Sequence, residues 1–251
     1  MPRLRTIFVD SEDFKGDRIR LSDKNKNYLF NVLRMKSGDQ IMVSDGRSSY
    51  LARLTEESDS DLGATMEKQI ETGDFLALDI TLVFGCVRPD PIEQILRHCT
   101  ELGVRSFVPM LFERNTRKPQ EKKRRWENIV AAACAQSLRL VPPTVHEPMF
   151  LKDFISGLHD ECLRIFLDRY ASNGLISVLD SSRSDHVIML VGPEGGLTKN
   201  EAELLEENQF IKVSLGNTIL RTETASIASV SVAICWAKEN MTLKRVENHG
   251  P

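Results

Sequence analysis

The hydrophobic pattern changes its period near residue 73, and this change restricts the chain to a two-part mixed fold. Before it, short β-compatible runs follow one another closely, with a single predicted helix at Asn27–Arg34. The runs are Arg5–Val9, Gln40–Ser44 and Ser49–Leu54. After it, strand-length apolar runs alternate with segments of helical spacing. We therefore expect a small β-barrel or sandwich over residues 1–73 and an α/β domain with a largely parallel sheet over residues 74–251.

Local signals place some boundaries within these two parts. Asp90 as N-cap, Pro91 at the first helical position and Glu93 at the third predict a helix, which Gly103 ends. The acidic, glycine-containing segment Glu56–Gly73 predicts an irregular strand and a linker. A long helix with a basic start is predicted at 120–138, and a final helix at 223–238.

The net charge averages over segments of opposite sign. The 251 residues carry 33 Lys and Arg against 36 Asp and Glu, which gives −3. The segment 105–139 has nine Lys or Arg against three Glu, 9 − 3 = +6, and the first 53 residues have eleven against seven, 11 − 7 = +4. Because a polyanion responds to local potential, the charge pattern leaves binding to RNA or DNA open.

The sequence does not support a membrane protein or a protein stabilised by disulfides. The longest strongly apolar stretch, Ala225–Ala237, is too short to span a bilayer, and the N-terminus lacks the apolar core of a signal peptide. The five cysteines, at 86, 99, 134, 162 and 235, form no CxxC pair, which argues against a zinc site or a disulfide framework. We expect no bound metal, and a reducing, cytoplasmic setting.

The strongest local signal is a glycine-rich turn between an apolar strand and a helix. The run Val187–Val191 leads into the turn Gly192–Gly196, and Thr198 with Glu201 forms a capping-box pattern at the next helix. Glycines permit positive φ and a close approach of the backbone to a ligand. The turn has neither the Lys-Ser/Thr of a P-loop nor the GxGxxG dinucleotide pattern. A tight strand-to-helix connection without a ligand is the alternative interpretation.

A second connection of the same kind follows. The chain leaves a predicted strand at Leu215, crosses a short loop and enters a helix that Thr222 is expected to cap. Arg221 and Glu223 bring a cation and a carboxylate to the end of that strand, although surface charge around a helix cap is the alternative. Loops after consecutive parallel strands lie at the carboxyl edge of the sheet, where ligands of open α/β domains bind.

These motifs resemble those of a known family. GPEGGLTKNE (192–201) and LGNTILRTETA (215–225) resemble the cofactor loops of the RsmE family, SPOUT-class methyltransferases that modify uridine N3 in 16S ribosomal RNA. The likeness extends over nearly the whole chain, through NYLFNVLRMKSGD, VSDG, IEQILRHCTELGV, VPMLFERN, AAACAQSLR and VPP. It implies a PUA-like N-terminal barrel, a C-terminal SPOUT domain with a deep trefoil knot, a homodimer, and S-adenosylmethionine held in bent form by the knot loops.

The resemblance assigns cofactor binding to three loops. The residues are Leu167; Gly192, Pro193, Glu194, Gly195 and Gly196; and Leu215, Gly216, Ile219, Leu220 and Arg221. Adenine is expected to lie against Ile219, Leu220 and backbone amides. The final helix is mostly apolar and small, which packing within the domain explains in part and a subunit interface would explain further.

Methylation of uridine N3 requires removal of the imide proton and alignment of the nitrogen with the methyl group. Glu194 and Glu223 are the candidates for accepting the proton or orienting the base, and Arg221 or Arg114 for stabilising the uridine anion. The sequence does not choose between them, since Glu223 is explained equally well as a carboxylate favoured by the helix dipole. The target base must be presented singly or flipped into the pocket.

Basic side chains predict an RNA-binding surface that contacts phosphates without reading sequence. A solvated helix face is the alternative for such a run of charge, and Trp126 within it is expected to belong to the core. The predicted RNA-binding residues are Arg3, Arg5, Arg34, Arg114, Arg117, Lys118, Lys122, Lys123, Arg124 and Arg125.

The sequence also departs from the family pattern on the RNA and interface sides. Asn27-Tyr28 stands where the family has a His-His or Asn-His pair, and Pro91-Ile92 stands where it has Lys-Met. His98 replaces a lysine of the family pattern, and Ala135 replaces a glutamate. Two alternatives therefore stand beside an rRNA uridine-N3 methyltransferase. One is a non-catalytic RNA-binding or ribosome-assembly protein that retains the fold, and the other is a SPOUT methyltransferase with another RNA target.

Overall fold

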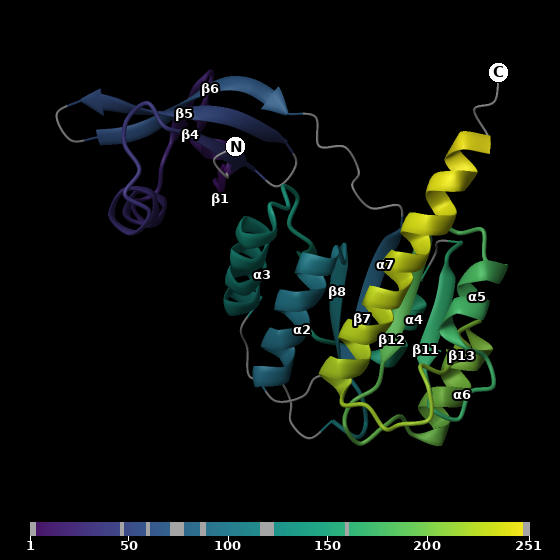
Figure 1. Ribbon diagram of the computed structural model, residues 1–251. Helices are drawn as coiled ribbons and strands as arrows, with labels where there is room; N and C mark the ends of the chain where they lie inside the picture. Colours follow the sequence, from purple (N-terminus) through teal and green to yellow (C-terminus); the bar gives the residue numbers. More distant parts are fainter. Residues whose placement is uncertain are drawn as a thin grey trace. The chain divides into compact units, whose positions relative to one another are not determined.

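A computed structural model describes residues 4–45, 48–58, 61–70, 78–85, 89–115, 123–158 and 161–247. The chain divides into two compact units, residues 1–75 with 131–142, and residues 76–130 with 143–251. Each unit contains one β-sheet, and helices accompany both sheets, which confirms the predicted mixed α/β class (Figure 1). Within the described ranges, no helix is long and apolar enough to cross a membrane.

The first unit is built on a six-stranded sheet of order β1-β4-β5-β6-β3-β2. Strands β1 and β4 pair parallel, and the other neighbours pair antiparallel. Among the described residues, β1 and β2 lie at the two ends of this path. The strands are β1 (Arg5–Phe8), β2 (Phe14–Lys15), β3 (Arg18–Arg20), β4 (Gln40–Ser44), β5 (Ser49–Ser58) and β6 (Asp61–Ile70).

The three strands predicted for this unit are confirmed, and so is an irregular strand within Glu56–Gly73, whereas the linker predicted at its end lies outside the described residues. Residues 61–70 form β6, which pairs antiparallel with β5 but with register shifts between Leu51 and Ala52 and between Glu56 and Ser58. Composition predicted irregularity because acidic residues and glycine have low β propensity, yet the cross-strand partner decides strand formation at such positions. Alternate residues of the paired strands, such as Ile41, Val43 and Leu54, are fully buried and form the core of the unit.

The predicted helix of the first unit begins earlier than the sequence indicated. A short helix α1 (Asp23–Lys26) runs directly into a π-helical turn η2 (Asn27–Val32). The backbone N–H of Asn25 donates to Ser22 Oγ, which makes Ser22 the N-cap. Leu29 is fully buried by this turn, whereas Arg34 follows it in the left-handed region at φ 56°.

The second unit contains a parallel sheet, as predicted. Its path is β10-β8-β7-β12-β11-β13, with β9 paired to β8, and every pairing is parallel. Most connections are crossovers through helices, which is the required link between parallel strands. The strands are β7 (Asp79–Gly85), β8 (Ser106–Leu111), β9 (Thr144–Val145), β10 (Met149–Phe150), β11 (Leu163–Leu167), β12 (His186–Val191) and β13 (Ile211–Val213).

The longer helices agree with the sequence except at their ends. Helix α2 begins at Pro89, so Asp90 lies in its first turn and the prediction that Asp90 caps it is wrong. A carboxylate in the first turn is still favoured by the helix dipole. Helix α2 ends at Leu102, and the next residue, Gly103, has φ 106° as the predicted stop requires. The helices are α2 (Pro89–Leu102), α3 (Lys123–Ser137), α4 (Leu151–Ser156), α5 (Leu175–Ser181), α6 (Lys199–Glu207) and α7 (Thr222–Glu247).

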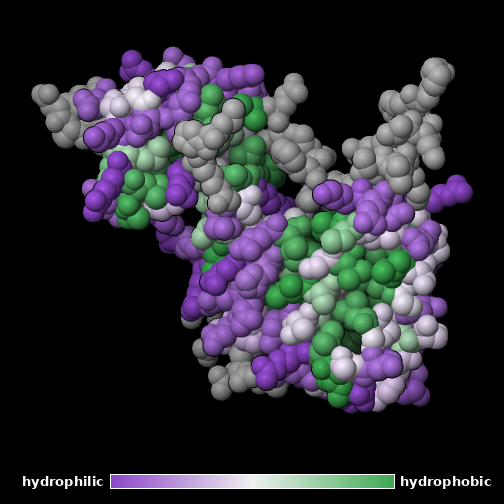
Figure 2. Space-filling view, in the orientation of Figure 1, coloured by the Kyte–Doolittle hydropathy of each residue, from purple (hydrophilic) through white to green (hydrophobic). Residues whose placement is uncertain are grey.

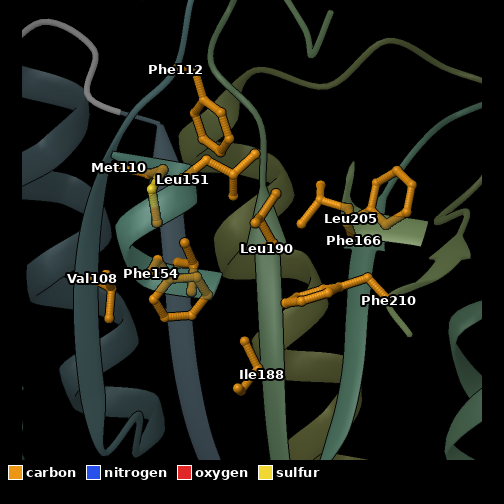
Figure 3. Close-up of a cluster of buried hydrophobic side chains, with 11 residues drawn as sticks. Val108, Met110, Phe112, Leu151, Phe154, Phe166, Ile188, Leu190, Leu205 and Phe210 are labelled. Atoms are coloured by element: carbon orange, nitrogen blue, oxygen red, sulfur yellow. The ribbon is translucent and has the colours of Figure 1, made fainter. Parts of the chain in front are cut away.

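Helices cover both faces of the parallel sheet. Figure 1 shows α2 and α7 in front of the sheet and α4 behind it. Figure 3 shows the cluster on the α4 side, where Leu151 and Phe154 meet Val108 of β8 and Ile188 of β12. The same cluster includes Phe166, at the last but one position of β11, and this packing fixes the end of the strand from which a functional loop departs.

Helix α7 is the central helix of the other face. It packs against β7, β12, α2 and α5, and it extends to Glu247, beyond the predicted end at 238. No Gly or Pro interrupts the segment 239–247, so nothing local stops the helix there. Several apolar side chains of α7 stay half-buried, and Figure 2 shows apolar residues gathered on the face that α7 crosses.

The cysteines of the described residues are free thiols. Burial raises the pKa of Cys134 to about 12, against the weaker opposing effect of Arg139, and burial also raises the pKa of Cys99. Both groups are therefore neutral thiols near pH 7 and are structural rather than nucleophilic. Within the described ranges, no group of three or more His, Cys, Asp or Glu side chains is placed to hold a metal ion.

Candidate functional site

Three loops that follow neighbouring parallel strands line one cavity of about 550 Å³. Strands β12, β11 and β13 are adjacent, so the loops at their carboxyl ends meet at the same edge of the sheet. This is the arrangement that the sequence predicts for the Gly192–Gly196 turn and the loop after Leu215. The cavity is lined by residues 166–170, 191–199, 202, 213, 215, 216, 218–220, 222 and 225.

The first glycine-rich loop is a closed turn followed by a capped helix. The N–H of Gly196 donates to the carbonyl of Pro193 at 2.8 Å, and Gly196 has φ 69°, a conformation that favours glycine. The predicted capping box is confirmed. Glu201 N–H donates to Thr198 Oγ1 at 3.3 Å, and Thr198 N–H donates to Glu201 Oε2 at 2.8 Å. The turn is therefore held at a fixed entry to α6.

Glu201 also joins this loop to the loop after β8. Its Oε1 accepts a hydrogen bond from Glu113 N–H at 2.8 Å. The next residue, Arg114, donates from Nη1 to the carbonyls of Gly195 and Leu197, at 3.2 and 3.3 Å. One carboxylate and one guanidinium thus clamp two loops that lie more than eighty residues apart in sequence.

Two glycines permit the backbone to pack closely around this loop. A Cβ on Gly85, at the end of β7, would lie 2.6 Å from Pro193 N and 2.7 Å from Pro193 Cα. A Cβ on Gly195 would lie 3.1 Å from Arg114 Cβ and 3.2 Å from its carbonyl oxygen. Gly85 was not predicted as a site residue, because in the sequence it simply comes at the end of a predicted strand. Its role becomes visible only in the fold, where Pro193 of a distant loop packs against it.

The loop after β13 is tied to the glycine-rich loop by a side chain. Thr222 Oγ1 donates to the carbonyl of Gly192 at 3.0 Å. The prediction that Thr222 caps the last helix is wrong, because Thr222 is the first residue of α7 and its hydroxyl makes this long-range bond instead. The hydroxyl therefore holds the ends of two cavity loops together.

The structure brings most of the predicted cofactor residues together. Ten of the eleven line the cavity, and Arg221 is the exception, exposed at the end of its loop. Of the proposed catalytic residues, Glu194 lines the cavity, whereas Arg114 contacts the loop from outside it. Glu223 does not line the cavity. It is 8% exposed, and its Oε2 has no hydrogen-bond partner among the described residues.

The predicted RNA-binding residues are spread over both units. Arg5, Arg34, Arg114 and Arg124 are exposed, and Arg125 forms an ion pair with Glu93 of α2. That pair partly neutralises the basic run through a residue far away in sequence. Trp126 is 6% exposed, as its predicted core position requires. Lys123 begins α3, and Arg3, Arg117, Lys118 and Lys122 lie outside the described residues.

Several cavity residues were not predicted individually. Asp168, Arg169 and Tyr170 follow β11, Thr218 belongs to the loop after β13, and Lys199 is the first residue of α6. The sequence signal for the first three is weak, since the segment after Leu167 has no glycine-rich motif. The carboxyl-edge argument would have reached them, because they leave a predicted parallel strand next to the other two loops.

The departures from the family pattern sit mainly on helices. His98 Nδ1 lies 3.7 Å from Glu101 Oε2, a pairing within one turn of α2, and Pro91 is buried in the same helix. Ala135 is half-buried in α3, and Tyr28 packs against the core of the first unit. None of these four positions lines the cavity.

Comparisons with known proteins agree with this geometry. A family model described as an RNA methyltransferase domain matches residues 75–234, and one described as an RNA methyltransferase PUA domain matches residues 15–62. The chain is 33% identical to "Ribosomal RNA small subunit methyltransferase E" of Synechocystis sp., over 90% of this chain and 75% of the relative. It is 28% identical to the protein of that name from Bacillus subtilis, over 87% and 90%.

Solved structures show the same fold. The ribosomal RNA small subunit methyltransferase E from Neisseria gonorrhoeae, bound to S-adenosyl methionine, superposes with a TM-score of 0.82 at 28% identity, covering 92% of this chain and 96% of that one. A putative methyltransferase from Legionella pneumophila, also in complex with this cofactor, gives 0.80 at 26% identity over 92% and 97%. The three-loop cavity, the two matched domain models and these relatives together show that the chain belongs to the RsmE family of RNA methyltransferases.

Proposed function

We propose that this protein transfers a methyl group from S-adenosylmethionine to N3 of a uridine in 16S ribosomal RNA of the small ribosomal subunit. The cavity formed by the loops after β11, β12 and β13 carries the proposal, because a structure of the same fold is bound to this cofactor. The names of the relatives support small-subunit RNA as the substrate. The choice of uridine N3 rests on the resemblance to the family.

The residues around the cavity fit this cofactor. A volume of about 550 Å³ lies within the roughly 300–1,000 Å³ usual for small-molecule sites. Ile219 and Leu220 offer apolar contact to adenine, and the carboxylates of Asp168 and Glu194 complement a cationic ligand. A Cβ on Gly192 would lie 3.3 Å from Leu197 Cγ, so a side chain there would require Leu197 to shift by a few tenths of an ångström. When bound, S-adenosylmethionine supplies an electrophilic methyl group.

Glu194 is the better candidate for the proton acceptor. Of the two carboxylates that the motifs suggest, Glu194 lines the cavity and Glu223 does not. We assign to Glu194 the orientation of the uridine and the acceptance of its N3 proton. Arg114 holds the loop that carries Glu194 through its bonds to Gly195 and Leu197, and in this position its positive charge favours the uridine anion.

Replacing Glu194 with glutamine tests this assignment. General-base catalysis contributes roughly 10²–10⁴-fold, so Glu194→Gln should slow methyl transfer at least 100-fold, whereas the loss of one of two carboxylates near the cation should weaken S-adenosylmethionine affinity by less than about tenfold. The rate is measured with labelled cofactor, and the affinity by calorimetry. Glu207→Gln, at an exposed position of α6, is the matched control and should leave both values unchanged. Full activity of the Glu194 variant would remove this residue from the mechanism.

Transfer of labelled methyl to ribosomal subunits separates this function from its alternatives. Undermethylated small subunits should accept label and large subunits should not. A protein that binds the cofactor but labels no RNA would be the non-catalytic assembly factor. Label on another RNA would indicate a different target within the same enzyme class.

The remaining features of the family are proposed with this function. They are an RNA-binding PUA-like barrel over residues 1–73, a SPOUT domain with a trefoil knot over 74–251, a homodimer, and a cytoplasmic site of action. The PUA match at 15–62 supports the RNA-binding barrel. The homodimer is supported by half-buried apolar side chains on α7, namely Ile227, Val232 and Ile234. An experimental structure would test barrel closure and the knot, and a monomeric mass in sedimentation would contradict the dimer.

RNA phosphates are proposed to contact the exposed arginines of both units. Arg5 and Arg34 belong to the first unit and Arg124 to the second, and each has an exposed side chain. Contacts to phosphate release counterions, so binding to small subunits should weaken steeply with salt. Salt-independent binding would exclude this role.

A further inference from the structure

Of the large apolar side chains that line the cofactor cavity, two are far more exposed than the others. Tyr170 is 78% exposed and Ile219 is 77% exposed, and both line the cavity. Single exposed apolar residues are common on protein surfaces. A pair on two loops of the same cavity is different, because such residues contribute little to folding but offer contact area to a ligand.

The turn that presents Tyr170 is held at both ends. Tyr170 N–H donates to Asp168 Oδ1 at 2.9 Å, and Ala171 N–H donates to the Asp168 carbonyl at 3.1 Å. Asp168 N–H in turn donates to the carbonyl of Val213 in β13 at 3.0 Å, and Ser214 N–H donates to the carbonyl of Asn173 at 2.8 Å. The ring is therefore presented on a turn fixed to the neighbouring strand, so a ligand that binds it pays little ordering entropy.

Arg169 holds the ring and leaves much of it accessible. Its guanidinium carbon lies 4.3 Å from the ring centroid of Tyr170, and its Nη2 donates to the Tyr170 hydroxyl. A cation over one face restricts the ring. Because the side chain is still 78% exposed, the opposite face is open to solvent. The result is a flat aromatic surface with a positive charge beside it.

We propose that Tyr170 is a stacking platform for the RNA base that leaves its stack for methylation, with Arg169 placed for a neighbouring phosphate. The proposal rests on the proposed function. Uridine N3 lies on the Watson–Crick edge and cannot be reached inside a duplex, so the base must be unstacked. Aromatic side chains stabilise unstacked bases without reading their sequence.

The test compares three substitutions in the full-length protein. Tyr170→Ala and Tyr170→Leu should raise both the Kd and the KM for undermethylated small subunits by roughly 10- to 100-fold. Tyr170→Phe keeps the π-face and should stay within about threefold of the unaltered protein. The Kd for S-adenosylmethionine, measured by calorimetry without RNA, should change less than threefold in all three.

Phe150→Ala is the matched control, since Phe150 is a 56% exposed aromatic residue on β10, at the far end of the sheet path from β13. This substitution should leave both the Kd and the KM for undermethylated small subunits unchanged. Equal RNA binding by Tyr170→Ala and the unaltered protein would overturn the proposal. A loss of cofactor affinity would also overturn it, because the ring would then serve the cofactor. The RNA Kd is measured whether or not methyl is transferred, so an inactive unaltered protein counts against the proposed function alone.

Discussion

Replacing Gly85 with alanine should weaken S-adenosylmethionine binding by roughly 5- to 150-fold. The new Cβ would lie 2.6–2.8 Å from the backbone N, Cα and Cβ of Pro193, so the backbone must move. Overpacking of this kind costs about 1–3 kcal/mol, and 1.4 kcal/mol corresponds to a tenfold change in affinity. The displaced residue begins the turn that lines the cavity. Calorimetric titration with the cofactor measures the effect.

Gly157→Ala is the matched control for that substitution. A Cβ there would meet its nearest atoms, the carbonyl oxygens of Phe154 and Asp153, at 3.6 and 3.7 Å, which is ordinary van der Waals contact. Gly157 follows α4 and does not line the cavity. The control should bind the cofactor normally. Unchanged affinity in Gly85→Ala, with a normal melting temperature, would show that the Pro193 turn does not hold the cofactor.

Removing the Glu201 carboxylate should uncouple two loops at once. Glu201→Ala loses the bonds from Glu113 N–H, Thr198 N–H and Thr198 Oγ1, of which the first two measure 2.8 Å. Hydrogen bonds to a charged group contribute about 1.5–3 kcal/mol when buried and less at a half-exposed site such as this one, so we expect about 2 kcal/mol of destabilisation in total. Methyl transfer should fall about tenfold in kcat/KM, because Arg114 and the 192–198 loop lose their common anchor.

Glu203→Ala, on the same helix, controls for the loss of a charge. Glu203 Oε1 lies 3.4 Å from Lys199 Nζ, with both side chains largely exposed, so the pair contributes less than about 0.5 kcal/mol. Urea unfolding and the transfer assay should separate the two variants clearly. If Glu201→Ala and Glu203→Ala have the same free energy of unfolding and the same kcat/KM, the hydrogen bonds of Glu201 between the loops do not contribute to activity.

Strands and motif loops of the second unit could be predicted from the sequence because their signals are local. The apolar run before Gly192 becomes β12, and the capping box of Thr198 and Glu201 forms as the spacing indicates. Both depend on residues that are neighbours in the chain. The cofactor candidates came from the resemblance to the family, and ten of them line one cavity because parallel strands bring their carboxyl ends to one edge.

The features that escaped prediction depend on distant partners. Thr222 was expected to cap α7, yet its hydroxyl bonds to Gly192, thirty residues away. Gly85 matters because Pro193 packs against it, and Arg125 is paired because α2 brings Glu93 to it. A local pattern reports what a residue prefers in isolation, whereas the fold decides which contact it makes. Tyr170 was not predicted either, because a single exposed tyrosine is not part of any repeating hydrophobic pattern in the sequence.

The most direct test of the central claim is nucleoside analysis of small-subunit RNA after incubation with this protein and S-adenosylmethionine. Undermethylated small subunits from a strain lacking the modification are treated, and their 16S RNA is digested and separated by mass spectrometry against nucleoside standards. The proposed function predicts 3-methyluridine that is absent without the protein and strongly reduced with Glu194→Gln. No gain in any methylated nucleoside, under conditions where calorimetry shows the cofactor bound, would contradict it.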